Sequence, residues 1–176
     1  RGASNYGNAV VGTVSGSSIS FGSPTVFISS NISGISASFD SNAGKTGIFF
    51  TDNGNSSYGK ALVATISGTS VSFGSTVTHA SVDTQGRRDS TFDSSQNKML
   101  FSFQNDATNG QARVGTINAS GNSISFGTAV TFESGRPNHI SSAFDSVNNK
   151  ILTIYQDVGD YINYGYKGKA VVGTIS

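Results

Sequence analysis

Residues 61–74 read ALVATISGTSVSFG, and this stretch recurs along the chain. Residues 9–22 read AVVGTVSGSSISFG, residues 112–127 read ARVGTINASGNSISFG, and residues 170–176 read AVVGTIS. The Ser-Phe-Gly triplet that ends the stretch begins at residues 20, 72 and 125, in steps of 52 and 53 residues. A constant period of this length is the signature of a repeat architecture.

Two further landmarks recur with the same period. The triplet Phe-Asp-Ser begins at residues 39, 92 and 144, and in each copy a lysine follows its serine by four residues. Each unit therefore contains four candidate strands, which we place at residues 9–15, 18–27, 34–40 and 47–52, at 61–67, 70–79, 88–93 and 98–105, and at 112–118, 123–132, 140–145 and 150–157. The constant spacing indicates a structural unit.

Alternation of apolar and polar residues favours strands over helices. Ile19 and Phe21 share one face of a strand, and Ile35, Ala37 and Phe39 share a face of another, with serines between them. No segment carries apolar residues at helical spacing over the length of a helix. In the first hairpin of the second unit, the pattern predicts a core made of Val63, Ile66, Val71 and Phe73.

The turns between the strands contain residues with a defined role. Gly16 and Gly68 supply the positive φ of a tight hairpin. The aspartate of each Phe-Asp-Ser is expected to accept hydrogen bonds from its own turn; the alternative is one ligand or Ca²⁺ site per unit. The residue before each recurring lysine is expected in the left-handed region. The turn aspartates are Asp40, Asp93 and Asp145. The residues expected in the left-handed region are Gly44, Asn97 and Asn149, and the lysines that follow them are Lys45, Lys98 and Lys150.

Four antiparallel strands in a unit of this length correspond to a β-propeller blade, so we predict an all-β fold of propeller-type four-stranded blades. Residues 1–176 form a single repeat domain with units at about 9–60, 61–111 and 112–169 and a partial fourth at 170–176. Three repeats plus one extra strand fall short of the roughly four to eight blades of a closed propeller. Pairing of two chains, a longer parent array, an open β-repeat array and tandem small sandwiches remain as alternatives.

The partial repeat at residues 170–176 has no following strand to pair with. We expect it to pair with residues near the N-terminus, with another chain or with a continuation of this one. Since Arg1 begins within a repeat, the chain is expected to be a piece of a longer protein or a processed product. Self-association through unfilled strand edges is the corresponding prediction.

The composition argues against several classes of function. Eleven Lys and Arg stand against ten Asp and Glu, for a net charge of +1, so we expect no nucleic-acid partner. No apolar run approaches the roughly 18 residues of a membrane span, so no membrane insertion is expected. The chain has no Cys, which rules out disulfides and thiolate metal sites.

Metal ligands do not gather in any recognisable pattern. The loop after the fourth strand is the best Ca²⁺ candidate, and it contains Asp52, Asn53 and Asn55 in one unit and Asp157 and Asp160 in another. Because Ca²⁺ takes about six to eight oxygen ligands, a polar surface loop is the stronger reading. His79 and His139 occupy non-equivalent places and are expected to be single surface or loop histidines. We therefore predict no cofactor and no metal, with Ca²⁺ at this loop as the alternative.

Arginines and tyrosines are the better candidates for ligand binding. Arg87 and Arg88 lie in the same loop of one unit as Arg136 does in the next, and arginine grips the carboxylates or sulfates of acidic glycans. The variable loop carries tyrosines with flat faces suited to sugars, namely Tyr58, Tyr161, Tyr164 and Tyr166. No acid–base pair, phosphate loop or sialidase-type Asp box is present, so we predict that the chain is not an enzyme.

The repeat GNAVVGTVSGSSISFGSPTVF, followed by FDSNAGK and DNGNSSYGK, resembles tandem arrays in predicted proteins of aquatic bacteria and their phages. Those arrays resemble propeller-like repeats of large surface, tail-fibre or virion-associated proteins. The resemblance covers residues 5–176 and carries no catalytic motif. It implies a structural or adhesive role outside the cell, at the cell surface, in a filament or on a virion. A glycan-binding, lectin-like propeller is the alternative function.

Overall fold

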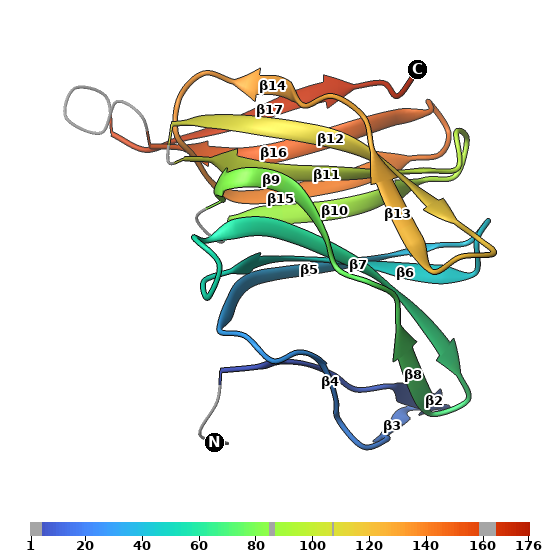
Figure 1. The fold of residues 1–176 in the computed structure, drawn as a ribbon. Coiled ribbons are helices and arrows are strands. Elements are labelled where there is room, and N and C mark those ends of the chain that lie inside the picture. Colours follow the sequence, from blue (N-terminus) through green and yellow to red (C-terminus); the bar gives the residue numbers. More distant parts are fainter. Residues whose placement is uncertain (1–4, 85–86, 107, 159–164) are drawn as a thin grey trace.

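The computed structural model describes residues 5–84, 87–106, 108–158 and 165–176, and every strand in this part of the chain pairs antiparallel with its neighbours. The chain begins with a ribbon of four short strands, β1 (Gly7–Ala9), β2 (Gly12–Ser15), β3 (Ser18–Phe21) and β4 (Thr25–Ile28). Strand β1 pairs with β4 and β2 pairs with β3. We call these four strands the N-terminal ribbon (Figure 1). No helix that is long and apolar enough to cross a bilayer occurs among the described residues.

Three larger sheets follow the ribbon. Sheet 1 contains β5 (Ile32–Asp40), β6 (Lys45–Asp52), β7 (Tyr58–Ser67), β8 (Ser70–Phe73) and β9 (Val77–Asp83). Sheet 2 contains β10 (Arg88–Asp93), β11 (Lys98–Asn105), β12 (Asn109–Asn118), β13 (Ser123–Phe126) and β14 (Val130–Glu133). Sheet 3 contains β15 (Pro137–Asp145), β16 (Lys150–Asp157) and β17 (Lys167–Gly173). Each sheet starts at the Phe-Asp-Ser strand, so the sheets are out of phase with the sequence units.

The outer strand of sheets 1 and 2 consists of two pieces. Strands β8 and β9 both pair with β7, at its two ends, and β13 and β14 pair with β12 in the same way. Residues 74–76 separate the first two pieces, where the Gly74 N–H donates to the Val63 carbonyl at 2.8 Å. The predicted continuous strand over residues 70–79 is therefore wrong. In the ribbon the same gap contains Pro24, which has no N–H to donate to a strand partner.

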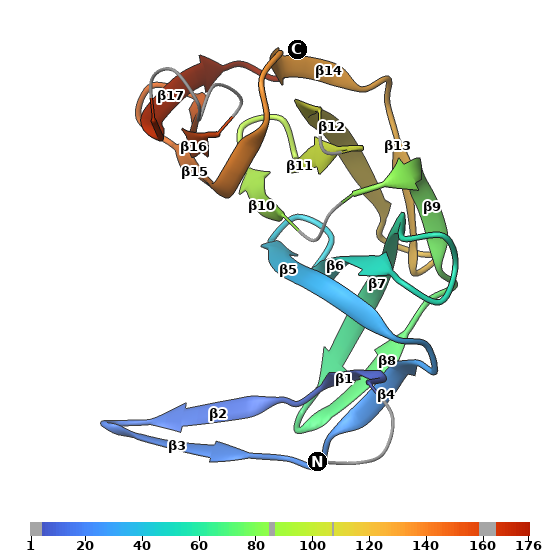
Figure 2. The same ribbon diagram turned by 90° about the vertical axis from the view of Figure 1, so that its left-hand side faces the viewer.

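The three sheets stand side by side along an arc, with β5, β10 and β15 on its inner side (Figure 2). Side chains of these inner strands bond across the sheets. Ser36 Oγ donates to Asp89 Oδ1 at 3.2 Å, and the Ser142 N–H donates to Asp89 Oδ2 at 2.6 Å. One carboxylate of sheet 2 thus connects the inner strands of sheets 1 and 3.

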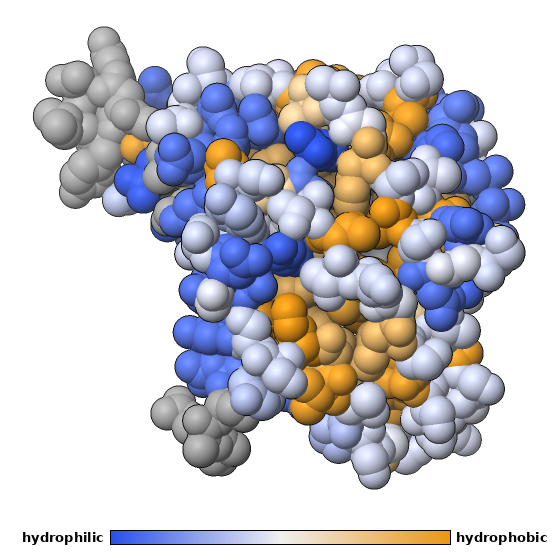
Figure 3. Space-filling view, in the orientation of Figure 1, coloured by the Kyte–Doolittle hydropathy of each residue, from blue (hydrophilic) through white to orange (hydrophobic). Residues whose placement is uncertain are grey.

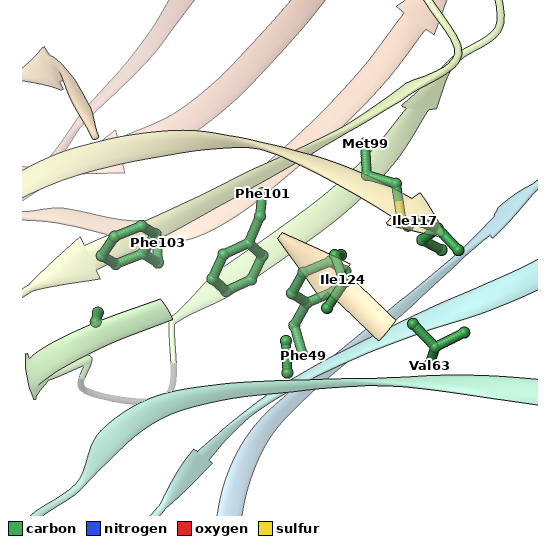
Figure 4. Close-up of a cluster of buried hydrophobic side chains, with 9 residues drawn as sticks. Phe49, Val63, Met99, Phe101, Phe103, Ile117 and Ile124 are labelled. Atoms are coloured by element: carbon green, nitrogen blue, oxygen red, sulfur yellow. The ribbon is translucent and has the colours of Figure 1, made fainter. Parts of the chain in front are cut away.

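The main core lies between sheets 1 and 2 and is rich in phenylalanine (Figure 4). Phe49 stacks on Phe101 with 4.4 Å between ring centroids, and Phe101 stacks on Phe103 at 5.3 Å. All three rings are fully buried. A second cluster, which includes Phe50 and Leu62, lies between sheet 1 and the N-terminal ribbon. The alternation predicted from the sequence therefore buries one face of each strand against each neighbouring sheet.

An aromatic ring on the outer strand recurs at each junction between neighbours. Phe27 lies 5.4 Å from Phe50, and Phe132 lies 5.4 Å from Tyr155, centroid to centroid. At the junction of sheets 1 and 2, the ring is that of His79, 5.1 Å from Phe103. The expectation that His79 is a surface or loop histidine is wrong, since only 1% of it is exposed. Its place in the repeat is a core aromatic position.

The turns agree with their sequence pattern. Oδ1 of Asp40 accepts the N–H groups of Asn42 and Ala43 at 2.9 and 2.8 Å, and Asp93 and Asp145 make the same pair of bonds. The predicted turn role is therefore confirmed at all three aspartates. The residue before the recurring lysine has positive φ in every copy, 65° at Gly44, 53° at Asn97 and 52° at Asn149.

The recurring lysines have a defined partner that is not the turn aspartate. Lys98 Nζ donates to Thr116 Oγ1 at 2.9 Å, on the adjacent strand of the same sheet, and the lysines of sheets 1 and 3 make the equivalent bond. Each lysine therefore ties the second strand of its sheet to the third. Lys45 also donates to Asn122 of sheet 2.

The predicted hairpin core holds in part. Val63 is fully buried, and Val71 and Phe73 are half-buried against the second cluster. Ile66 is 52% exposed, so the prediction for this residue is wrong. Its side chain is on the face of sheet 1 that points toward the N-terminal ribbon, and the short ribbon does not cover it.

Candidate functional site

Three of the predicted ligand-binding residues line one hollow. Arg87, Arg136 and Tyr166 surround it together with Asn138 and Val158, and its volume is about 290 Å³. The backbone around it is fixed because the Val158 N–H donates to the Arg136 carbonyl at 3.0 Å. Arg136 and Tyr166 are exposed, so their side chains are accessible to a ligand.

Arg87 is already held on both sides. Its Nη1 donates to Gln104 Oε1 at 2.8 Å, and its Nε donates to Asn138 Oδ1. The guanidinium is thereby oriented at the junction of sheets 2 and 3. A ligand carboxylate or sulfate at this hollow would meet the oriented guanidinium of Arg87 and the exposed guanidinium of Arg136.

Arg88 points into the interior instead of the hollow. Only 8% of it is exposed; its Nη2 donates to Thr51 Oγ1 and, at 2.7 Å, to Thr84 Oγ1. Burial lowers the pKa of Arg88 to about 9, and the nearby Asp83 carboxylate raises it in part. The guanidinium carbon lies 5.7 Å from the centroid of the Phe101 ring. Arg88 therefore packs between sheets 1 and 2, although it also borders a wider hollow with Arg87 and His139.

The predicted tyrosine cluster is only partly described. Tyr58 is the first residue of β7 in sheet 1, where it is half-buried and opposite Asp83, and it does not line the hollow of Arg87 and Arg136. Tyr161 and Tyr164 lie outside the described residues, as does the Ca²⁺ candidate Asp160. Of the four tyrosines, Tyr166 alone is seen to join the arginines.

An ion-pair cluster that the sequence reasoning missed lies beside this hollow. Lys169 Nζ contacts Glu133 Oε2 at 2.8 Å and Asp157 Oδ2 at 2.7 Å. Tyr155 Oη donates to Glu133 Oε2 at 2.7 Å, and the Gly135 N–H donates to Glu133 Oε1 at 2.8 Å. Glu133 is the only glutamate of the chain, which was the one available sequence signal.

The protonation states in this cluster favour a structural role over a role in acid–base catalysis. Burial raises the pKa of Glu133, but the hydrogen bonds from Lys169, Gly135 and Tyr155 and the charge of Lys169 outweigh it and leave the pKa below its ordinary value. Burial and the bond to Glu133 raise the pKa of Tyr155 to about 12. Near neutral pH the carboxylate is ionised and the phenol is protonated, and both are already bonded to each other.

No group of three or more His, Asp or Glu side chains with the geometry of a metal site occurs in the described ranges. Asp52 accepts bonds from Ser30 Oγ and from the Gly54 N–H, so the loop carboxylate caps its own turn. Burial and the charges of Arg88 and Arg113 lower the pKa of His79 to about 2, so this imidazole is neutral at physiological pH. His139 is exposed, with a φ of 48°.

Apolar side chains gather at the two ends of the row of sheets. At the far side of sheet 3, Ile154 and Val172 are 48% and 62% exposed. Their repeat-equivalent residues in sheet 1, which are those at the same position of the repeat, are Phe49 and Val63, and both are fully buried against sheet 2. At the other end Ile35 and Phe39 of β5 are also more than half exposed.

Apolar residues also reach the surface beside β8 and β13 (Figure 3). The chain matches no protein-family model and no curated protein.

Proposed function

We propose that this chain is a non-catalytic structural or adhesive repeat protein of an extracellular surface, a filament or a phage particle, and that it assembles through its ends. The observation that carries the proposal is the pair of apolar end faces. Positions that are buried between sheets inside the row are exposed at both of its ends. Burial of apolar surface is the main driving force of protein association, and contiguous exposed apolar patches mark interaction sites.

The architecture we propose for the assembly is a row of propeller-type blades. Two features support this proposal: in sheets 1 and 2 the two outer pieces share one strand partner, so each sheet has three strands and a divided fourth, and the inner strands β5 and β10 of these sheets are neighbours. Two chains would contribute six sheets to a ring, whereas an open β-repeat array would extend without closing. The contacts between neighbouring sheets would be the same in a closed ring and in an open array.

Sedimentation velocity over a range of concentrations tests this proposal. We expect the wild-type chain to associate at micromolar concentration. The double variant Ile154→Ser/Val172→Ser removes apolar area from one end face and should shift association to higher concentration. Val147→Ser is the matched control, because Val147 is 87% exposed in a turn away from the sheet faces. A wild-type chain that stays a folded monomer contradicts the proposal.

Glycan binding is the second candidate, and the hollow of Arg87, Arg136 and Tyr166 favours it. Acidic sugars with a carboxylate or sulfate are the ligand class that these side chains fit, since arginine binds such groups through paired N–H donors and tyrosine offers a flat face. On a glycan array, Arg136→Ala should abolish binding, whereas Lys60→Ala removes a half-buried cation of sheet 1 that does not line the hollow and should preserve binding. An array without reproducible binding contradicts this second candidate.

A further inference from the structure

Sheet 3 has a free strand edge where its neighbours are paired. Strand β7 carries β8 and β9 along its outer edge, and β12 carries β13 and β14. Strand β17 occupies the same place in sheet 3, and within the described ranges it pairs with β16 alone. Among the described residues, the backbone groups on the other edge of residues 170–173 are therefore open to a further strand.

Two glycines mark the missing contacts. A Cβ on Gly12 would lie 3.0 Å from Ile19 and from Phe21, and a Cβ on Gly115 would lie 3.0 Å from Ile124. These glycines thus sit beneath the outer strand that follows them. Gly173 is the repeat-equivalent residue of β17, and among the described residues no atom beyond its chain neighbours comes within 4 Å of a Cβ there.

A second glycine position of the repeat shows the same difference between β17 and the other copies. A Cβ on Gly7 would lie 2.5 Å from the Phe27 ring, and a Cβ on Gly110 would lie 2.6 Å from the Phe132 ring. Gly168 is their equivalent in β17, and no ring from the part of the chain that the structure describes lies above it. Both glycines of β17 are therefore uncovered at the places where an Ile-x-Phe strand and a following phenylalanine cover the other copies.

An apolar groove lies beside Gly173, between sheets 2 and 3. It has a volume of about 190 Å³, and its walls include Leu100, Val114, Val130, Ile151 and Ile175. The corresponding space between sheets 1 and 2 is filled, because Ile124 of β13 is buried in the core there and Phe126 packs against it. The groove has the place in the repeat of a missing Ile-x-Phe strand.

The N-terminal ribbon contains an Ile-x-Phe strand, β3, whose apolar side chains are not buried in the separate chain. Residues 18–22 read SISFG, as do residues 123–127. Ile19 and Phe21 are 55% and 65% exposed, whereas Ile124 is 5% exposed. The ribbon hairpin of β2 and β3 projects away from sheet 1 (Figure 2), and every residue of β2 is exposed.

We infer that residues 167–176 of one copy take up β3 and β4 of a second copy, in place of that copy's own β1 and β2. Residues 9–15, AVVGTVS, and residues 170–176, AVVGTIS, differ at one position. Every main-chain bond that β3 makes with β2 can therefore be made again with residues 173–176. Exchange of near-identical segments is a low-cost route to assembly.

The exchange adds contacts that the separate copies lack. Ile19 and Phe21 enter the groove between sheets 2 and 3, while Phe27 of β4 stays against Phe50 of its own sheet 1 and covers Gly168 of the other copy. Sheet 3 of one copy thereby becomes the neighbour of sheet 1 of the next. This inference rests on the proposed function and names the donor strand and the acceptor groove of its assembly.

Cysteine cross-linking tests the register directly, because the chain has no cysteine of its own. Thr65 pairs with Ser72 between β7 and β8, and the equivalent pair across the exchange is Thr174 and Ser20. The variant Ser20→Cys/Thr174→Cys should form disulfide-linked oligomers under mild oxidation. Ser125→Cys/Thr174→Cys is the matched control, since residue 125 lies in the same SISFG sequence but its strand β13 is already used. It should give no such product.

A second variant blocks the acceptor without disturbing the separate chain. Gly173→Val fills open space, so the variant should unfold at the wild-type urea concentration, and its association should weaken at least about tenfold because the valine occupies the volume of Ile19 and Phe21. Association by light scattering without the Ser20–Thr174 cross-link overturns the exchange and leaves end-face assembly intact. A chain that is monomeric throughout overturns both.

Discussion

Replacement of His79 by phenylalanine should make the protein less sensitive to mild acid. His79 occupies a repeat position that holds phenylalanine in its other two copies, Phe27 and Phe132, and neither imidazole nitrogen has a hydrogen-bond partner among the described residues. Burial, then the charges of Arg88 and Arg113, lower its pKa from 6.5 to about 2. Between about pH 6.5 and about pH 2, this imidazole is therefore neutral in the folded chain and protonated in the unfolded chain.

The sign and the size of the effect follow from proton linkage. A lowered folded-state pKa means that the unfolded chain binds more protons below pH 6.5, so the free energy of unfolding falls as the pH falls and is fully retained above that value. The slope is about 1.4 kcal/mol per pH unit, which amounts to about 2 kcal/mol between pH 6.5 and about pH 5. His79→Phe removes this contribution. It also removes two unpaired buried nitrogens, worth about 1–3 kcal/mol each at any pH.

Urea denaturation followed by circular dichroism measures both effects. The wild type and His79→Phe are compared at about pH 7.5 and about pH 5, and the quantity of interest is the difference between their unfolding free energies. That difference should grow in favour of the variant by about 2 kcal/mol on acidification. Space for the larger ring comes from Gly59, because the equivalent Gly7 and Gly110 already lie beneath phenylalanines. Equal losses of stability in the two proteins would refute the assignment of a neutral buried His79.

Three further outcomes are expected. Phe101→Ala should lower the unfolding free energy by about 3–5 kcal/mol in urea denaturation, because the ring is fully buried; a loss below about 1 kcal/mol would contradict the core. Asp93→Ala should cost about 1–3 kcal/mol and speed hydrogen exchange at residues 95 and 96, and unchanged exchange there would argue against the turn. Glu133→Gln should remove part of the acid sensitivity below pH 4.5, since the lowered pKa of Glu133 stabilises the fold above that pH and the benefit is lost as the pH falls through the folded-state pKa. Identical acid titrations of variant and wild type would exclude that role.

Local features of this fold were predictable because they depend on a few adjacent residues. The turn at Asp40 needs only a carboxylate and two nearby N–H groups, and the left-handed residue after it needs only glycine or asparagine. The strands followed from alternation of apolar and polar residues over a short window. The break between β8 and β9 was missed because alternation continues across it, and the main-chain bond of Gly74 that marks it has no side-chain signal.

The candidate site was less predictable, since its members come from separate strands and loops. Arg87, Arg136 and Tyr166 share a hollow, but Arg88, the first residue of β10, is buried between sheets 1 and 2, where it donates to Thr51 and Thr84. The cluster around Glu133 joins β14 of sheet 2 with β16 and β17 of sheet 3, which come together only in the folded chain. Sequence spacing alone could not bring these side chains together.

The sequence by itself determined the repeat, its strands and its turns, because each of these is a property of one unit. Only the tertiary structure decided which copy of each apolar residue is buried. Ile66 is 52% exposed, whereas its equivalent Ile117 is 7% exposed, with the same side chain at the same point of the repeat. Sheet 1 covers the second isoleucine, and no full sheet covers the first. Burial in a repeat depends on the neighbouring unit, which is why equivalent apolar positions that are buried between sheets inside the row are exposed at its ends.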